Sequence, residues 1–375
     1  MKRVLRIVGW TLLGLFLIVA AVFFWASSGS LSNAEQAQLH TYDASPPSAH
    51  RDTFTVMTYN IGYLSGMTNN KPVERDSALF RENMAQAVNL IREVDPDFVA
   101  LQEIDFGANR SLYVNQLDTL AARLGYTAAS QAVNWDKRYL PFPYWPPSVH
   151  FGRTLSGQAL LSRYPIRSHQ RLELARSSRP FWSDAFYLDR LAQVSIVDVG
   201  GWPLAIINVH LEAFDEETRE QQARQLRRIY NRYQAKQIPI LLVGDFNSLR
   251  PGDRSMVPPG QRAALSSDKT MGIITNELNL DAAVPESAVL TSELRGTYPA
   301  DDPKYKIDHI FYRRNRIKKT GATIVCGAPN PPSDHCAVVL SFRLPRPPDP
   351  SKTFPFPDDA FEVESISLDT LNEAG

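Results

Sequence analysis

The sequence predicts a layered α/β domain preceded by one membrane-spanning helix. Two patterns predict this fold class. In residues 52–345, short apolar runs alternate with amphipathic stretches, which is typical of sheets packed inside helices. In residues 7–26, twenty consecutive positions carry no charge. Periodicity alone leaves the choice among α/β folds open.

The composition excludes several other classes of protein. The chain has 375 residues, 43% of them hydrophobic, with 40 basic and 40 acidic side chains. This length supports one large domain or two ordinary ones, and the composition excludes a collagen, a coiled coil, a disulfide-stapled mini-domain and a wholly disordered chain. A formal charge of zero argues against a strongly basic coat for nucleic acid. Cys326 and Cys336 are too few for a disulfide framework, and one bridge or two buried thiols both remain open.

The amino-terminal run Ile7–Ala26 predicts a transmembrane anchor. At about 1.5 Å per residue, a helix of this length spans a hydrocarbon core of roughly 30 Å. The apolar part of a cleavable signal peptide is shorter, although the small residues at 26–28 keep that alternative open. A buried core helix fits a charge-free run at the terminus poorly. The basic flank 1–6, with Lys2, Arg3 and Arg6, predicts a cytoplasmic start and places the rest of a single-pass chain on the extracytoplasmic side.

Two further segments flank the predicted domain. Residues 27–51 are rich in Ser, Ala, Gln and Pro and predict a linker. Residues 346–375 form a Pro-rich, acidic tail that we expect to be poorly ordered or draped on the surface. The domain between them, residues 52–345, holds 34 basic and 31 acidic side chains and is therefore almost neutral.

The apolar runs and amphipathic stretches locate the elements of this domain. The predicted strands are Phe54–Tyr59, Phe98–Gln102, Gln158–Leu161, Leu191–Val197, Leu204–Val209, Ile240–Val243, His309–Tyr312 and Ala337–Phe342. The predicted helices are Leu79–Val94, with Phe80, Met84, Val88 and Ile91 on one face, and Glu216–Ala235, with Ala223, Leu226, Tyr230 and Tyr233 on one face.

Acidic, amide and imidazole side chains occur where these strands begin or end. They are Asn60, Glu103, His210, Glu212, Asp245, Asn247, Asp308, Asp334 and His335. Side chains at strand ends can converge on one rim of a sheet, where a rigid scaffold holds them. Carboxylate and amide oxygens suit Mg²⁺ bound together with a substrate phosphate, with Mn²⁺ as the other candidate cation. The sequence has no HExxH, no paired CxxC and no P-loop, so it supports neither a zinc site nor P-loop nucleotide binding.

Each of these signals has a structural alternative when it stands alone. A Glu at a strand end is commonly a solvated loop residue, and GDFN at 244–247 also suits a turn. His210 could be a satisfied structural histidine, and SDH at 333–335 a polar start to a strand. Together, and in this order, the blocks favour a phosphate-ester hydrolase.

The ordered set resembles the endonuclease/exonuclease/phosphatase superfamily over residues 53 to 343. The matching blocks are TYN at 58–60, LQE at 101–103, HLE at 210–212, GDFN at 244–247, IDHIF at 307–311 and SDH at 333–335. The resemblance implies a four-layer α/β sandwich in which helices flank two packed mixed sheets. It also implies a metal-dependent phosphoesterase, since relatives include DNase I-like nucleases, abasic-site endonucleases, inositol polyphosphate 5-phosphatases and neutral sphingomyelinases.

The same resemblance implies a role for each matching residue. Glu103 looks like the principal metal ligand, with Asn60 beside it and Asp334 completing the metal or phosphate shell. Asp245 would orient or activate the attacking water. Asn247 would hold a phosphoryl oxygen. His335, paired with Asp308, would act as general base or as an imidazolium facing the phosphate, and His210 would stabilise a phosphoryl oxygen or protonate the leaving group. Lys306 and Tyr298 stand where many relatives have Arg and Trp, from which we expect altered substrate contacts.

The substrate is predicted from what surrounds this set. The anchor and the near-neutral domain favour a membrane-anchored phosphodiesterase acting on a lipid head group or another envelope-side ester. The aromatic and Pro-rich stretch at 135–151 suits a membrane interface, although a packed insertion loop or a surface for stacked bases fits it too. A secreted or anchored endonuclease with nucleic acid as substrate is the alternative, and an inactive binding module of the same fold is a lesser one. No protein partner is predicted.

Overall fold

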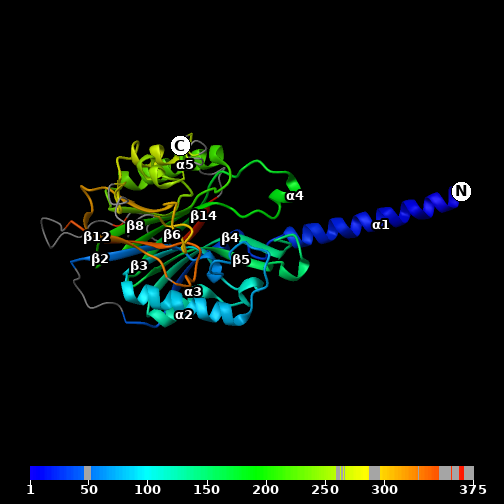
Figure 1. Ribbon diagram of the computed structural model, residues 1–375, viewed down its shortest axis with the longest axis horizontal. Coiled ribbons are helices and arrows are strands. Elements are labelled where there is room, and N and C mark those ends of the chain that lie inside the picture. The colour runs from blue at the N-terminus through cyan, green and yellow to red at the C-terminus, as the bar shows by residue number, and fades with distance from the viewer. Residues whose placement is uncertain are drawn as a thin grey trace.

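Two seven-stranded mixed sheets pack face to face, and helices cover both outer faces (Figure 1). The computed structural model describes residues 1–45, 52–258, 262, 265, 267–286, 296–327, 329–345, 356 and 363–366. The strand order is β1-β4-β5-β3-β2-β13-β12 in the first sheet and β10-β11-β9-β8-β7-β6-β14 in the second. This is the four-layer sandwich that the resemblance implied, and that prediction is confirmed.

The elements follow one another along the chain with short connections. The strands are β1 Ala37–Thr41, β2 Phe54–Asn60, β3 Phe98–Asp105, β4 Ala128–Leu140, β5 Gly152–Ser162, β6 Ile166–Glu173, β7 Leu191–Asp198, β8 Pro203–His210, β9 Ile240–Asp245, β10 Asp281–Ala282, β11 Asp308–Tyr312, β12 Lys318–Val325, β13 Ala337–Arg343 and β14 Val363–Ile366. The α-helices are α1 Lys2–Ser27, α2 Ser77–Val94, α3 Gln116–Leu124, α4 Phe181–Asp184, α5 Glu216–Ala235 and α7 Thr270–Thr275. Short 3-10 turns are η1 Asn33–Gln36, η2 Gly62–Leu64, η3 Asn109–Ser111, η4 Pro147–Val149 and η5 Pro251–Met256.

Three apolar cores hold the four layers together. One lies between the sheets, where β2, β3, β8, β9 and β13 contribute alternate residues such as Phe98, Ile206 and Leu340. The second joins the first sheet to α2 and α3, and the third joins the second sheet to α5 and α7. Because both faces of the central strands are buried, these strands are continuous apolar runs, and this made them visible in the sequence.

The eight predicted strands and both predicted helices are present, and the faces predicted for α2 and α5 are buried. The sequence analysis missed β1, β4, β6 and β12 together with the short β10 and β14. In β4 and its neighbours, polar residues face the space between the sheets, so these strands lack a clear hydrophobic pattern in the sequence. Ser130 of β4 hydrogen-bonds Ser195 of β7 at 2.8 Å, and Gln193 donates to the Ser130 carbonyl at 3.0 Å. A polar network between sheets is satisfied only in the folded state, and hydrophobic periodicity does not report it.

A β-bulge in β3 shapes the edge of the first sheet. Leu101 pairs with Ala159 of β5, but Ile104 pairs with Gly157, so β3 carries one extra residue between these pairs. Glu103 lies in this bulge with a left-handed φ of 50°. A bulge interrupts the regular alternation of side chains between the two faces of a sheet. This one changes the direction of the Glu103 side chain.

The segment predicted as a linker is partly built into the domain. After α1, η1 leads into β1, which pairs antiparallel with β4 from Ala37↔Ala132 to Thr41↔Ala128. Residues 46–51 of this segment lie outside the described residues. The difference arises because β4 offers a free sheet edge, and pairing satisfies backbone groups that composition cannot show.

Part of the predicted tail also joins a sheet. Val363–Ile366 forms β14 and pairs parallel with β6 from Val363↔His169 to Ile366↔Leu172. Apart from these residues and Phe356, residues 346–375 lie outside the described residues. An acidic tail can still contribute an edge strand, because main-chain hydrogen bonds do not depend on side-chain charge.

The close packing at the bulge predicts a strong effect of Gly157→Ala. A Cβ at Gly157 would lie 1.9 Å from the Ala132 carbonyl oxygen, so neighbouring backbone would have to move. We expect a loss of about 3 kcal/mol in the free energy of unfolding, as for an overpacked core site. Gly321→Ala in β12 is the matched control, because its nearest neighbour, the Ser341 Cβ, lies at 3.9 Å. Thermal unfolding of the two variants in detergent checks this, and equal stabilities would contradict it.

Candidate active site

Strand register brings the predicted site residues to one edge of the sandwich. In the second sheet, β8 and β9 are parallel and pair His210 with Asp245. The next strand, β11, pairs Asp308 with the same Asp245. In the first sheet, β2 and β3 are parallel, and Asn60, the last residue of β2, pairs with Gln102, next to Glu103. Because the carboxyl ends of parallel strands meet at the same edge, these side chains face one another across the two sheets.

Asp245 lies at the centre of the cluster and is 1% exposed. The Asn60 amide nitrogen donates to its Oδ2 at 3.0 Å, and the Asn247 backbone N–H donates to its Oδ1 at 2.9 Å. The Nε2 atoms of His210 and His335 lie 3.6 and 3.9 Å from the same Oδ2. One carboxylate oxygen is therefore shared by an amide and two imidazoles. Such an oxygen can orient or accept a proton from a water molecule.

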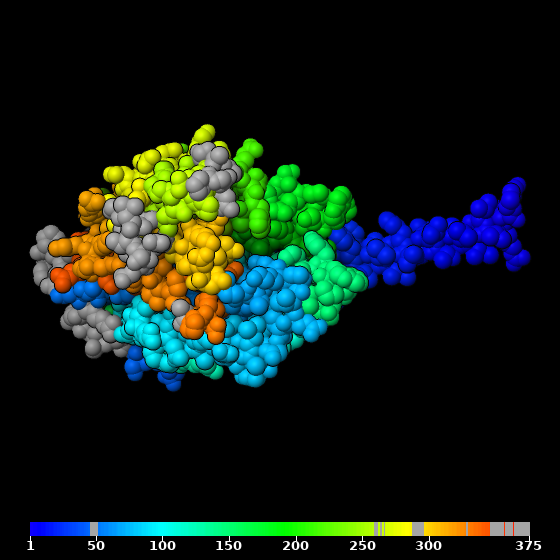
Figure 2. Space-filling view, viewed as in Figure 1, coloured from blue at the N-terminus to red at the C-terminus, as the bar shows by residue number. Residues whose placement is uncertain are grey.

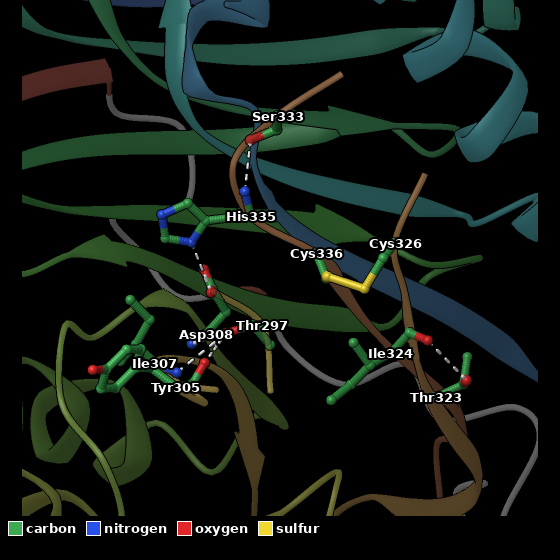
Figure 3. The surroundings of a disulfide bond; sticks show 10 residues. All are labelled: Thr297, Tyr305, Ile307, Asp308, Thr323, Ile324, Cys326, Ser333, His335 and Cys336. Carbon is green, nitrogen blue, oxygen red and sulfur yellow. Dashed lines mark hydrogen bonds and ion pairs between the residues drawn. A yellow bond between two sulfur atoms is a disulfide. The ribbon is translucent and has the colours of Figure 1, made fainter. Parts of the chain in front are cut away.

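Asp308 orients the His335 ring through a 2.9 Å contact between Oδ2 and Nδ1 (Figure 3). The backbone N–H of Asp308 donates to the Thr297 hydroxyl at 3.2 Å, and the His335 N–H donates to the Ser333 hydroxyl at 3.1 Å. Ser333 in turn donates to the Asn60 carbonyl at 2.7 Å. With Nδ1 engaged by a carboxylate, Nε2 is the ring atom that faces the cluster.

Glu103 and Asp334 form an acidic pair bridged by Asn69. The Asn69 amide nitrogen donates to Glu103 at 2.9 Å and lies 3.3 and 3.4 Å from the two Asp334 oxygens. Gly62, with a φ of +51°, lets the backbone pass close by, since a Cβ there would be 2.7 Å from Asp334 Oδ1. The Gly62 N–H also donates to the Asn60 side-chain oxygen at 3.1 Å. In this arrangement the Asn60 amide positions the Asp245 carboxylate.

A disulfide ties the strand that carries His335 to its neighbour. Cys336, next in sequence, is bonded to Cys326 at the end of β12 (Figure 3). The Cys336 N–H donates to the Thr297 carbonyl at 2.7 Å, and Thr297 also holds Asp308. The bridge therefore anchors the backbone on one side of the His335–Asp308 pair. Of the two alternatives that the sequence left open for the cysteines, the structure has the bridge.

Burial and mutual repulsion raise the pKa of two carboxyls in the cluster. Burial, followed by the charge of Asp334, raises the pKa of Glu103. Burial, followed by the charge of Asp308, raises the pKa of Asp245 to about 7. Carboxyls that hold their protons this strongly need a positive charge nearby to ionise fully.

The two histidines shift in opposite directions. Burial alone would lower the pKa of His335, but the charge of Asp308 and its hydrogen bond raise it well above the usual value. Burial, with the nearby charges of Arg190 and His335, lowers the pKa of His210 well below the usual value. At neutral pH His335 is therefore the imidazolium of the site and His210 the neutral imidazole. With pKa values this different, the two histidines can take different roles in proton transfer.

The structure places all eight predicted residues in this one network. They are Asn60, Glu103, His210, Asp245, Asn247, Asp308, Asp334 and His335. The amide nitrogen of Asn247 donates to the Leu211 carbonyl at 3.0 Å, and its backbone is left-handed with a φ of 48°. Left-handed backbone at both Asn247 and Glu103 is of the kind that clusters at functional sites.

The sequence analysis missed Asn69 and Arg190. Arg190 is 4% exposed, and its Nε and Nη1 have no hydrogen-bond partner among the described residues. Its nearest anion is Glu212, with Nε 3.7 Å from Oε2, and Tyr187 donates to the same carboxylate at 2.9 Å. A buried guanidinium with free donors beside the cluster can bind a phosphoryl oxygen. Arg190 directly precedes β7, so the sequence pattern that could have identified it is a polar residue at the start of a strand.

The two departures from the family pattern have different environments. Lys306 is 1% exposed and lies 3.3 Å from Asp253, and burial lowers its pKa to about 8. Its ammonium group pairs with an interior carboxylate, and the altered substrate contact expected for this residue stays a prediction. Tyr298 packs its ring 4.9 Å from the His335 ring, centroid to centroid, and so borders the cluster.

The donor set fits a divalent cation. Ligand atoms of the buried Asp245, Asp308 and His335 lie within 4.8 Å of one another, and because Asp308 keeps His335 an imidazolium, the ligands left for a cation are the carboxylates. Asp308 Oδ1 is buried without a hydrogen-bond partner among the described residues. Together with Glu103 and Asp334, these are mostly hard oxygen ligands whose charges are not balanced locally. A cation of the Mg²⁺ or Mn²⁺ type suits such a set.

Comparison with known proteins gives a family match. The model of the Endonuclease/Exonuclease/phosphatase family matches residues 57–335, which include every block of the site. A comparison with curated protein sequences gave no match.

Several solved structures share the fold. An endonuclease/exonuclease/phosphatase from Beutenbergia cavernae DSM 12333 is 19% identical, with a TM-score of 0.57 and coverage of 78% of this chain and 72% of that one. The human Nocturnin catalytic domain with bound sulfate anion is 19% identical, with a TM-score of 0.53 and coverage of 84% and 100%. An endonuclease/exonuclease/phosphatase from Bacteroides vulgatus is 16% identical, with a TM-score of 0.53 and coverage of 79% and 100%. At these identities the likeness concerns the fold.

The raised pKa values predict a pH-dependent stabilisation by a divalent metal. A carboxyl whose pKa is raised on folding favours the folded state at low pH, and this contribution is lost as the pH rises through the folded pKa. A cation that replaces the proton restores it. The rise in Tm on replacing EDTA with excess cation should therefore be small at pH 5 and grow through pH 7, near the pKa of Asp245, to pH 8.

Glu103→Gln should remove more than half of this metal-induced shift, because it deletes a ligand charge without changing volume. Glu93→Gln, exposed on α2, is the matched control and should keep the full shift. Thermal unfolding at the three pH values measures both. A shift that shrinks with rising pH, or one that survives in Glu103→Gln, would contradict the ligand assignment.

The geometry of His335 predicts a loss of turnover rather than of binding. His335→Ala should lower kcat by about 10² or more with little change in KM, since proton transfer in the transition state is worth that much. His40→Ala, on β1 outside the cluster, should keep the wild-type kcat. Steady-state kinetics on a soluble phosphodiester measures both constants, and an effect confined to KM would assign His335 to binding.

Proposed function

Because this chain belongs to the endonuclease/exonuclease/phosphatase family of metal-dependent phosphoesterases, we propose that it is a membrane-anchored, Mg²⁺-dependent phosphodiesterase. Its proposed substrate is a lipid head group or another ester on the extracytoplasmic side. The observation that carries the reaction class is the gathering of Glu103, Asp245, Asp308 and His335 at one sheet edge. Oxygen ligands, an ion-paired imidazole and a buried guanidinium are the groups that phosphate-ester hydrolysis requires.

Each residue of the site has a separate proposed role in hydrolysis. Glu103 and Asp334, bridged by Asn69, are the residues that would hold the metal, with Asn60 beside them. When bound, the metal supplies positive charge against the phosphoryl oxygens and lowers the pKa of a coordinated water. Arg190, whose Nε and Nη1 have no hydrogen-bond partner among the described residues, would donate to a phosphoryl oxygen. Asn247, whose amide nitrogen also donates to the Leu211 carbonyl, would add a second donor.

The proton transfers follow from the pKa shifts. Asp245, held by Asn60 and by the Asn247 N–H, accepts the proton of the attacking water. The water oxygen bonds to phosphorus as the ester P–O bond breaks. His335, kept charged by Asp308, donates its Nε2 proton to the leaving oxygen. The neutral His210 donates a hydrogen bond to the phosphoryl group, which gains charge in the transition state.

The membrane part of the proposal rests on α1. This helix has 26 residues, a mean hydropathy of 2.6 in its most apolar window and none of that window buried, so it is long and apolar enough to cross a membrane. The basic flank favours a cytoplasmic start. The Cys326–Cys336 disulfide supports the same sidedness, because disulfides persist in extracytoplasmic, oxidising compartments. The near-neutral domain favours a lipid head group over a long polyanion.

A panel of substrates tests the proposal on the full chain, because β1 makes the segment after α1 part of the fold. The purified protein in mixed micelles is given a phospholipid, duplex DNA and a soluble phosphodiester, each with Mg²⁺ or EDTA. We expect Mg²⁺-dependent cleavage of the lipid and the soluble diester, and loss of at least about 10² in rate in Glu103→Gln.

The arms of the panel separate the alternatives. Cleavage of DNA without cleavage of lipid would replace the proposed substrate with nucleic acid. No Mg²⁺-dependent turnover of any ester would overturn the enzymatic proposal and favour a binding module. Equal activity of wild type and Glu103→Gln would assign the turnover to a contaminant.

A further inference from the structure

We propose that an aromatic surface around the end of α1 seats the domain on the bilayer, with the catalytic edge facing the membrane side. This surface, the aromatic rim, consists of Tyr144 and Trp145 in the β4–β5 loop and Phe181 and Trp182 in α4. The proposal rests on the membrane anchoring proposed above and deepens it, because it names the surface that meets the lipid.

The four side chains of the aromatic rim expose most of their apolar surface to solvent, which is energetically unfavourable. Tyr144 is 71% exposed, Trp145 76%, Phe181 68% and Trp182 59%. Transfer of one such side chain from water to an apolar environment is favourable by roughly 2 kcal/mol. Burial of all four would therefore contribute several kcal/mol to binding. Large exposed apolar groups that occur together mark an interaction surface.

Direct contacts place the rim at the level of the last turn of α1. Phe23 of α1 packs edge-on against Phe181, with ring centroids 5.9 Å apart, and against Phe186 at 5.4 Å. Phe23 lies three residues before Ala26, about 4.5 Å along the helix axis. If α1 crosses the bilayer, Phe181 therefore lies at the membrane–water interface.

The other half of the rim begins where α1 ends. The Arg138 N–H of β4 donates to the Ser28 carbonyl at 3.0 Å, and β4 ends two residues beyond Arg138, where the β4–β5 loop follows. In Figures 1 and 2 the blue helix leaves the domain between the green segment that holds α4 and the blue-green end of the β4–β5 hairpin. The rim therefore has members on both sides of the helix.

The joint between α1 and the domain is fixed. The Asp136 carboxylate accepts the backbone N–H groups of Ser30 at 2.6 Å and Leu31 at 2.8 Å. Arg153 pairs with the same carboxylate at 2.7 Å and donates to the Ser30 hydroxyl at 2.6 Å. A joint with four polar contacts within a few residues of the helix end keeps the domain against the membrane surface, where a flexible tether would let it move away.

Strand topology places this joint at the same edge as the active site. β3 carries Glu103 near that edge, and its last residue, Asp105, pairs with Ser156 of β5. The neighbouring residue, Leu155, pairs with Asp136 of β4, which holds the joint. Only β5 separates β3 from β4 in the sheet, so the metal-binding edge and the anchor lie two strands apart. The proposed substrate, an ester in the lipid head-group layer, is within reach of such an edge.

The chemistry of the rim fits a lipid surface. Trp and Tyr are the residues enriched at the head-group level of membranes, since each combines an apolar ring with a polar atom. The rim is continuous with a helix whose residues 7–26 carry no charged side chain. Lys137 and Arg138 lie near the end of β4, just before the same loop, where their basic side chains can contact lipid phosphates.

Depth-dependent quenching of tryptophan fluorescence tests the proposal. The chain has tryptophan at positions 10, 25, 135, 145, 182 and 202. Trp135 is buried and kept in all variants, and the signal of a variant with Trp135 alone is subtracted. Four further variants of the full chain each keep one more tryptophan, at 10, 145, 182 or 202, with phenylalanine at the others. Each is reconstituted in phosphatidylcholine vesicles whose acyl chains carry bromine near the head-group end or near the middle.

We expect the head-group-end bromines to quench Trp145 and Trp182 about twofold, as for residues in the interfacial belt. Trp202, in the β7–β8 turn at the opposite end of β8 from His210, is the matched control and should not be quenched. Trp10 reports insertion of α1 and should be quenched in both kinds of vesicle.

The four positions separate the two proposals. Quenching of Trp10 without quenching at Trp145 or Trp182 would overturn the aromatic rim and leave the anchor intact. An unquenched Trp10 would overturn the anchoring itself, and the rim with it. Quenching of Trp202 as strong as that of Trp145 would show unspecific adsorption and would also overturn the rim.

Discussion

The pairing of Asp245 with His210 on one side and Asp308 on the other is the constraint on which the site depends. Backbone hydrogen bonds of β8, β9 and β11 fix these three residues side by side. Glu103 and Asp334 approach from the first sheet, so several carboxylates share one buried edge. Burial, together with repulsion from the neighbouring carboxylates, raises the pKa values of Glu103 and Asp245. The negative charge of these carboxylates can be balanced by a bound cation, by the His335 imidazolium and by Arg190.

The scaffold around this edge is arranged to hold these positions rigidly. The bulge in β3 re-aims Glu103, left-handed backbone sets Glu103 and Asn247, and the disulfide at Cys336 fixes the start of β13. The central strands of both sheets are buried on both faces, and the space between the sheets is partly polar. Local strain at the site is thus supported by a large and well-packed surround.

The helix α1 joins the domain close to the candidate site, because Asp136 of β4 holds the joint and only β5 separates β4 from β3, which carries Glu103. The segment after α1 is part of the fold, since η1 and β1 continue it. Under the membrane attachment proposed above, this joint would set the orientation of the domain, and with it the esters that can reach the site.

The sequence by itself determined the class of fold, the membrane-length helix and the candidates for the site. Buried strands such as β8 and β9 are continuous apolar runs, and the polar residues beside them are visible in the sequence. Asn60, His210 and Asp245 end such strands, Glu103 lies near the end of one, and His335 precedes one. The tertiary structure alone decided which atoms meet. Asn69 and Arg190 come from loops whose sequence has no period, β4 is hidden because its polar residues are satisfied across the sheets, and Lys306 supports the interior. Pairing partners depend on contacts between residues far apart in the chain, and local sequence patterns do not record such contacts.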